Sequence, residues 1–129
     1  MPRRLSFFVV LLAVFGACGG SDEPAVGMSD DHAFEPATVA VAPGTEVVFT
    51  NDSDEAHTVT AYEDSVPDDA GYFSSGDLWS EAKARDEVAQ ALIPPGADYS
   101  VTLETPGTYQ YFCIPHEQDG MKGEIVVEE

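Results

Sequence analysis

The sequence predicts an all-β protein, an antiparallel Greek-key β-sandwich with a helical insert at about residues 75–93. Short segments rich in β-branched and aromatic residues recur from Val26 onward, and several alternate apolar with polar side chains. Pro-Gly and Asn-Asp turns separate these segments at close spacing, as in two packed antiparallel sheets. The expected strands cover residues 38–42, 46–50, 57–61, 99–103, 108–113 and 123–127.

One acidic stretch, residues 62–94, departs from this rhythm and predicts the helical insert. Apolar residues recur there at intervals of three, four and seven, which places them on one face of a helix. The residues of this apolar stripe are Leu78, Trp79, Ala82, Ala89, Leu92 and Ile93. Two interpretations are open. In the one we favour, Trp79 and Leu92 anchor a surface helix on the sandwich; in the other, the insert shapes a docking surface near the functional site.

The N-terminal residues are typical of a secretory signal peptide and are not expected to belong to the fold. A basic pair precedes an apolar stretch, residues 5–17, that is too short to span a bilayer. Small residues then lead to Cys18, in a pattern that resembles a lipobox, so we expect export and a lipid anchor on Cys18. The alternative is an unmodified Cys18 in an ordinary signal peptide. The expected parts are a signal peptide (1–17), a lipid-anchored tether (18–25) and one domain (26–129).

This organisation places the domain on the outer face of the cytoplasmic membrane or in the periplasm, where we expect a monomer. The chain holds 24 acidic residues against 5 Lys and Arg, a formal net charge of −19. That charge excludes nucleic acid as a partner and disfavours docking to an anionic membrane face. Two explanations of the acidity remain open: adaptation to molar salt, in which the Debye length falls to ~3 Å, or a docking surface for a basic redox partner.

A nine-residue run near the C-terminus combines a thiol, an imidazole and a thioether in Cys113, His116 and Met121. A thiolate, two imidazoles and a weak thioether form the ligand set of mononuclear electron-transfer copper sites. His57, at the start of another expected strand, completes the set. With Cys18 lipidated or removed, Cys113 is the single cysteine of the exported domain, and metal ligation would protect its sulfur from oxidation. The alternative is a buried core thiol beside unrelated loop and core residues.

We therefore predict one copper ion that cycles between Cu(I) and Cu(II), with Met121 as its long axial ligand. His32, the remaining histidine, is interpreted as a surface residue near the first strand. With one histidine to spare, a second, catalytic copper centre cannot be built within the chain, so we expect no enzyme. The alternative function is an extracytoplasmic copper-binding protein for delivery or storage of the metal. The rigid thiolate of Cys113 argues against that alternative.

A set of short motifs spans residues 26–129: Phe34-x-Pro36, Pro43-Gly44, Val47-Val48-Phe49-x-Asn51, His57-Thr58, Pro106-Gly107-Thr108-Tyr109-x-Tyr111-x-Cys113 and Gly120-Met121-x-Gly123. Together they resemble the cupredoxins, the type 1 blue copper proteins, of the plastocyanin and halocyanin type. The Cys-x2-His-x4-Met spacing is that of plastocyanins. The resemblance implies an eight-stranded sandwich, a type 1 copper site and a membrane-tethered carrier that shuttles single electrons between redox partners. The acidity and the lipid anchor are similar to those of halocyanins.

By the same analogy, electrons cross at the solvent-facing edge of His116, inside an apolar patch. Two positions depart from the plastocyanin pattern. Phe112 stands where plastocyanins usually have Tyr before the ligand Cys, and Thr58 stands where they usually have Asn after the first ligand His. Both positions lie beside the ligands in the sequence. The resemblance therefore leaves the partner and the reduction potential open.

Overall fold

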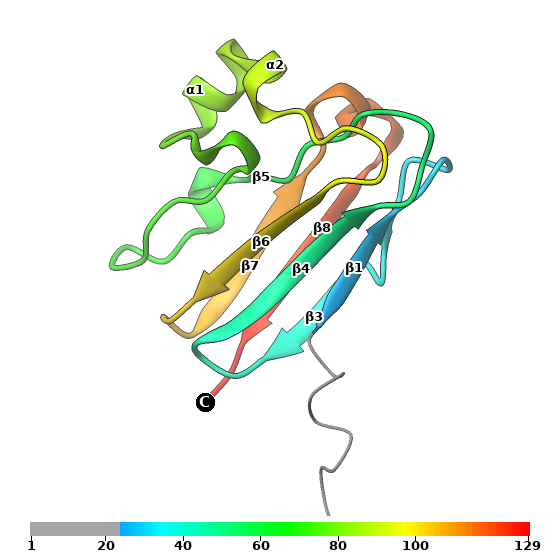
Figure 1. The fold of residues 1–129 in the computed structure, drawn as a ribbon. Helices are drawn as coiled ribbons and strands as arrows, with labels where there is room; N and C mark the ends of the chain where they lie inside the picture. The colour runs from blue at the N-terminus through cyan, green and yellow to red at the C-terminus, as the bar shows by residue number, and fades with distance from the viewer. Residues whose placement is uncertain (1–23) are drawn as a thin grey trace, which may run out of the picture.

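Two four-stranded sheets pack face to face in the computed structural model, which describes residues 24–129 (Figure 1). In spatial order, the first sheet consists of β2 (Phe34–Glu35), β1 (Ala25–Met28), β4 (Thr45–Asn51) and β6 (Asp98–Leu103). The second consists of β3 (Thr38–Val41), β8 (Lys122–Val127), β7 (Gly107–Phe112) and β5 (Thr60–Ala61). The expected β-sandwich is confirmed. The expected signal peptide and the expected lipid anchor on Cys18 lie outside the described residues.

The sheets are mixed, whereas the sequence predicted antiparallel ones. β1 runs parallel to β4 and β3 runs parallel to β8, while the other neighbouring strands are antiparallel. Because only residues 36–37 separate β2 from β3, the chain passes directly from one sheet to the other there and β3 aligns along β8. The alternation of side chains within a strand reports which face is buried and carries no information about the direction of its neighbour.

Aromatic side chains fill the space between the sheets. Alternate residues of β4, among them Val47 and Phe49, point into the core and are at most 1% exposed. Tyr111 on β7 meets Phe49 and Phe34 edge to face, with ring centroids 5.2 and 4.7 Å apart. Burial of each such side chain contributes roughly 1.5–3 kcal/mol to folding. This core holds β4 and β7 in fixed positions, and the candidate ligands lie in the loops that follow these two strands.

The helical insert is present, and its helices are shorter than the sequence predicted. It comprises η3 (Ser75–Asp77), α1 (Glu81–Asp86) and α2 (Val88–Ala91), with a break at Glu87, whose φ is −116° and ψ 48°. The Ser80 side chain caps α1 by accepting the backbone N–H of Lys83 at 3.0 Å. No helix within residues 24–129 is both long and apolar enough to cross a membrane.

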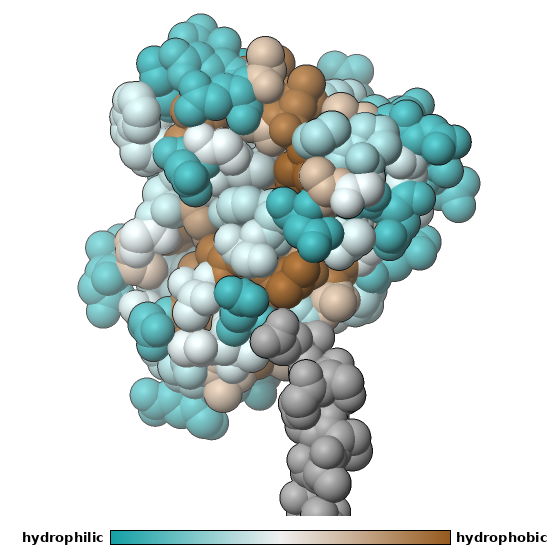
Figure 2. Space-filling view, in the orientation of Figure 1, coloured by the Kyte–Doolittle hydropathy of each residue, from teal (hydrophilic) through white to brown (hydrophobic). Residues whose placement is uncertain are grey.

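The insert is anchored by residues other than those we favoured. Trp79 is 70% exposed and Leu92 is 38% exposed, so the expectation that they fix a surface helix onto the sandwich was wrong. Leu78, Ala84 and Ala91 are buried instead and form a small cluster of their own. The break at Glu87 ends the helical period, so residues on either side of it do not share one face. Figure 2 shows hydrophilic residues over most of the visible face, with a strip of hydrophobic surface running down from the insert.

Candidate metal centre

The expected ligands meet where the loops after β4 and β7 come together at one end of the sandwich (Figure 1). Cys113 directly follows β7, and His116 lies in η4 (Ile114–Asp119), the turn that leads into β8. The backbone of His57 is fixed by two hydrogen bonds with Ile93: its N–H donates at 3.2 Å, and its carbonyl accepts at 2.7 Å. The site is therefore assembled where two loops that are far apart in the sequence meet.

Three donor atoms converge at this point. The Sγ atom of Cys113 lies 3.7 Å from His57 Nδ1 and 3.3 Å from His116 Nδ1, and the two nitrogens are 3.1 Å apart. Metal bonds of about 2.0 Å to nitrogen and about 2.3 Å to sulfur, spread around one ion, separate donor atoms by roughly these distances. His57 and Cys113 are fully buried, while the His116 side chain is 14% exposed. The triangle thus fits a single ion with one ligand at the rim.

Met121 closes the same loop. It is fully buried, its backbone N–H donates to His116 O at 3.2 Å, and its carbonyl accepts the N–H of Cys113 at 3.0 Å. Gly120 permits this closure because its φ of 82° lies in the left-handed region, and its N–H turns back to Glu117 and His116. The loop therefore holds Met121 next to Cys113 in the fold.

A buried network fixes the tautomer of His57. The amide of Asn51 donates to the carbonyl oxygens of Glu55 at 2.7 Å and Ile93 at 2.8 Å, which orients its Oδ1 toward Ser53. The Ser53 hydroxyl has acceptor-only neighbours in Asn51 Oδ1 at 2.6 Å and Glu55 O at 2.9 Å. His57 Nε2, at 2.8 Å, must then donate to Ser53 Oγ. With the proton on Nε2, the lone pair of Nδ1 faces the other two donor atoms.

The protonation states of the three groups suit metal binding. Burial lowers the pKa values of the His57 and His116 imidazoles, so both favour the neutral form that ligates metal. Burial raises the pKa of the Cys113 thiol, and the thiolate then needs a cation beside it. The N–H of Thr58 partly compensates by donating to Cys113 Sγ at 3.4 Å. A buried thiol that becomes a thiolate only with a bound cation is the behaviour expected of a metal ligand.

The two departures from the plastocyanin pattern have visible consequences. The Thr58 hydroxyl accepts the backbone N–H of Ile114 at 2.9 Å and so joins the two ligand loops directly. Phe112 is fully buried, and its ring stacks on Tyr62 with centroids 4.2 Å apart. The guanidinium of Arg85, from α1, lies 4.4 Å from the centre of the Phe112 ring. Phe112 is therefore covered by the insert and is not part of the open surface.

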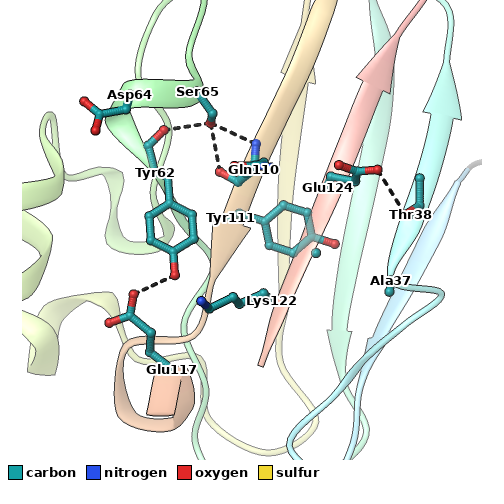
Figure 3. A pocket seen from close by; sticks show the side chains of 11 residues that line it. Ala37, Thr38, Tyr62, Asp64, Ser65, Gln110, Tyr111, Glu117, Lys122 and Glu124 are labelled. Atoms are coloured by element: carbon teal, nitrogen blue, oxygen red, sulfur yellow. Dashed lines mark hydrogen bonds between the residues drawn. The ribbon is translucent and has the colours of Figure 1, made fainter. Parts of the chain in front are cut away.

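The insert also contacts the ligand loop itself. Arg85 makes two parallel hydrogen bonds to the carboxylate of Glu117, at 2.9 and 3.1 Å, one residue beyond His116. The Tyr62 hydroxyl donates to the same carboxylate at 2.6 Å (Figure 3). Arg85 holds the pKa of Glu117 below its ordinary value, so this carboxyl stays charged. These contacts were not foreseen, because residues 62, 85 and 117 have no spacing that links them in the sequence.

A groove of about 770 Å³ opens beside these residues, along β7 and β8 (Figure 3). Tyr62, Glu117 and Lys122 line one end of it, and Gln110 and Tyr111 line its floor. None of the residues that line this groove is an expected copper ligand. It is separate from the metal centre, although Glu117 contributes to its wall.

His32 lies in the turn after β1 with its side chain 26% exposed, on the surface near the first strand as the sequence predicted, and this turn also brings it next to the metal centre. Its ring stacks on that of His116, with centroids 3.8 Å apart and an interplanar angle of 20°. Glu55 and Asp119 bind its two ring nitrogens, at 2.6 and 2.9 Å. The exposed edge of His116 therefore has polar and charged neighbours, and not only the apolar ones expected by analogy. In the sequence, the acidic turn around His32 was the one feature that could have indicated these charged neighbours.

A buried thiol and two imidazoles whose donor atoms could hold one metal ion define the class of site: a mononuclear copper centre of the electron-transfer kind. Comparison with known proteins agrees. Residues 24–128 match the family described as copper binding proteins, plastocyanin/azurin family. The plastocyanin of Lactuca sativa is 39% identical over 106 residues, which cover 81% of this chain and 98% of that protein. This chain belongs to the plastocyanin/azurin family of copper-binding proteins.

Solved structures show the same fold. The oxidized plastocyanin of Dryopteris crassirhizoma superimposes with a TM-score of 0.58 and 27% identity, over 81% of this chain and 99% of that one. Pseudoazurin from Methylobacterium extorquens AM1 gives a TM-score of 0.60 and 26% identity, over 84% of this chain and 76% of that one. The protein is thus a cupredoxin electron carrier with one type 1 copper ion, and it works with redox partner proteins.

Proposed function

We propose that this protein is a membrane-tethered carrier of single electrons, without catalytic activity of its own, whose copper ion is held by His57, Cys113, His116 and Met121. The observation that carries the proposal is the convergence of one sulfur and two nitrogens within 3.1–3.7 Å of one another. When bound, copper supplies a one-electron couple between Cu(I) and Cu(II).

The residues of the chain provide a cage that resists change of shape. Thr58 ties the loop of His57 to that of Cys113, and backbone hydrogen bonds tie Cys113 to Met121. A cage of this kind favours fast electron exchange, because its donor atoms need to move little when the charge of the ion changes. Full burial of His57 and Cys113 also excludes water from the inner side of the site.

The absorption spectrum of the Cu(II)-loaded protein tests the site. We expect an intense thiolate-to-copper charge-transfer band that is lost in Cys113→Ser and retained in Cys18→Ser, the matched change at the other cysteine. Reversible one-electron voltammetry that requires His116 and Met121 would support the carrier. A faint spectrum with rapid transfer of copper to a chelator would favour a delivery or storage protein instead. Absence of copper uptake would exclude both functions.

The direction of β1 supports tethering through the N-terminus. In the register of β1 on β4, Ala25 pairs with Val48 and Met28 pairs with Asn51, so the chain enters β1 away from the ligand loops. An anchor at Cys18, on the outer face of the cytoplasmic membrane or in the periplasm, would leave the copper end free to meet partners. We expect the full chain in the membrane fraction and Cys18→Ser in the soluble fraction. Equal partitioning of the two proteins would contradict lipid anchoring.

A further inference from the structure

The turn between β1 and β2 presents His32 in a defined position. The N–H of Ser29 donates to Ala33 O at 3.0 Å, and the N–H of His32 donates to Ser29 O at 3.2 Å. His32 adopts a φ of 54°, in the left-handed region that non-glycine residues seldom occupy. An unfavourable backbone conformation persists where the surroundings determine it, and it often marks a functional position.

The ring of His32 is held on three sides. Glu55 lies 2.6 Å from Nε2 and Asp119 lies 2.9 Å from Nδ1, and the two carboxylates come from the two loops that carry His57 and His116. These bonds orient the plane of the ring, which lies nearly parallel to that of His116 at 3.8 Å. His32 therefore covers one face of the single ligand that reaches the surface, whose side chain is 14% exposed.

We propose that His32 is a positioning residue for His116: its ring keeps that imidazole in the orientation in which Nδ1 faces the Cys113 sulfur, and it forms part of the surface that a redox partner meets. The inference rests on the proposed function in that it takes His116 as a copper ligand. The carboxylates around the stacked pair, on Glu55 and Asp119, are 51% and 60% exposed. The partner that fits this surface presents Lys or Arg side chains around its own redox group.

The structure offers a reason why His116 needs such a residue. His57 is held by its hydrogen bond to Ser53 and by full burial. Within residues 24–129, by contrast, the one polar partner of His116 Nε2 is Glu55, at 3.5 Å. Without the ring of His32, one face of His116 opens to water and its side chain gains freedom to turn away. Loss of a stacking contact between aromatic rings changes an equilibrium constant by up to about tenfold.

The experiment compares three variants. His32→Asn removes the ring but suits the left-handed backbone, so the turn is retained. His32→Phe keeps a stacking ring and loses both carboxylate bonds. Trp79→Ala is the control, because Trp79 is an exposed aromatic residue whose ring contacts Lys83. The readouts are the rate at which a chelator removes copper and, in the metal-free protein, the NMR linewidths and ring chemical shifts of His116.

We expect copper removal to be up to about tenfold faster in His32→Asn, with His116 signals that show a mobile ring, and close to the wild-type rate in Trp79→Ala. His32→Phe should restore most of the difference, which a role limited to folding of the turn would not produce. Wild-type copper removal and unchanged His116 signals in His32→Asn would overturn the inference. So would equal losses in the Phe and Asn variants, since stacking would then play no part.

Failure of the proposed function would be recognised separately. A wild-type protein that takes up no copper would contradict the electron carrier, and the NMR comparison of the metal-free variants would still report whether His32 orients His116. Docking is tested by electron exchange with redox proteins of opposite surface charge. Exchange with a basic partner should slow in Glu55→Gln,Asp119→Asn and in high salt. Exchange that is unaffected by both would contradict the assigned surface.

Discussion

The two sides of the ligand loops are held by different kinds of interaction. On the inner side, Asn51 and Ser53 form a buried network of neutral hydrogen bonds that ends on His57. On the flank that faces the insert, Arg85, Glu117 and Tyr62 form a partly exposed cluster of charges and rings. Both sides limit the movement of a ligand or of its neighbour. They differ in burial, and therefore in how much a single substitution should lower the free energy of unfolding.

The difference follows from solvation. A buried polar atom that loses its partner cannot bond to water and costs about 1–3 kcal/mol, whereas an exposed ion pair contributes about 0.2–1 kcal/mol and weakens in salt. The inner network therefore determines the chemistry of the site, because it decides which nitrogen of His57 carries the proton. The flank restrains the loop without determining a protonation state of any ligand.

The largest effect is expected on the inner side. Ser53→Ala leaves His57 Nε2 without its buried partner, so the free energy of unfolding should fall by about 1–3 kcal/mol and copper affinity about 10–100-fold. Urea unfolding and competition with a chelator measure the two quantities. Ser100→Ala, at an exposed serine of β6, is the control and should change stability by less than about 0.5 kcal/mol. Similar losses of stability in both variants would show that the buried network on the inner side has no special importance.

The turn of the ligand loop should come next. Gly120→Ala places a side chain at a φ of 82° where a Cβ meets no neighbouring atom, so any loss arises from the backbone. We expect a decrease of about 1 kcal/mol in the free energy of unfolding. Gly71→Ala is a matched control, since its Cβ also meets open space and its φ is not in the left-handed region. An unchanged free energy of unfolding in Gly120→Ala would show that the loop can adopt a different turn conformation.

A smaller effect is expected on the flank. Arg85→Gln removes the paired bonds to Glu117 and the contact with Phe112, at a cost of about 1 kcal/mol in dilute buffer that shrinks in 1 M NaCl. Lys83→Gln removes an exposed i,i+4 pair with Glu87 and should lower the free energy of unfolding less than Arg85→Gln does. Urea unfolding at both salt concentrations compares them. If 1 M NaCl does not reduce the loss of stability in Arg85→Gln, the interactions on the flank are not ionic.

The three histidines of the metal-free protein should have different pKa values. Burial lowers the pKa values of His57 and His116 from 6.5, while the bond to Glu55 raises that of His32. The unfolded state therefore binds protons more readily at the two ligands, and stability falls as the pH drops below about 6.5. His32 acts in the opposite sense, with a contribution that is lost as the pH rises through its own pKa. NMR titration measures all three, and a common pKa would contradict the assigned environments.

Much of the fold could be predicted from local pattern. Alternation in β4 and β7 places residues such as Phe49 and Tyr111 in the core, and the turn at Gly120 follows from a residue type that tolerates positive φ. The direction of β1 and β3 could not be predicted, because a strand shows the same alternation beside a parallel or an antiparallel neighbour. The anchors of the insert were also misplaced, since the break at Glu87 has no signal in the apolar period.

The sequence by itself determined the chemistry of this protein: a thiol, imidazoles and a thioether at fixed spacing, which point to copper because donor types select the metal. The tertiary structure decided the surroundings of those donors. Ser53 against His57, Arg85 against Glu117 and His32 on His116 are contacts between residues 4 to 84 positions apart, in three different loops and a helix. Such contacts depend on how the two sheets pack and where their loops meet, so no local pattern of residues predicts them.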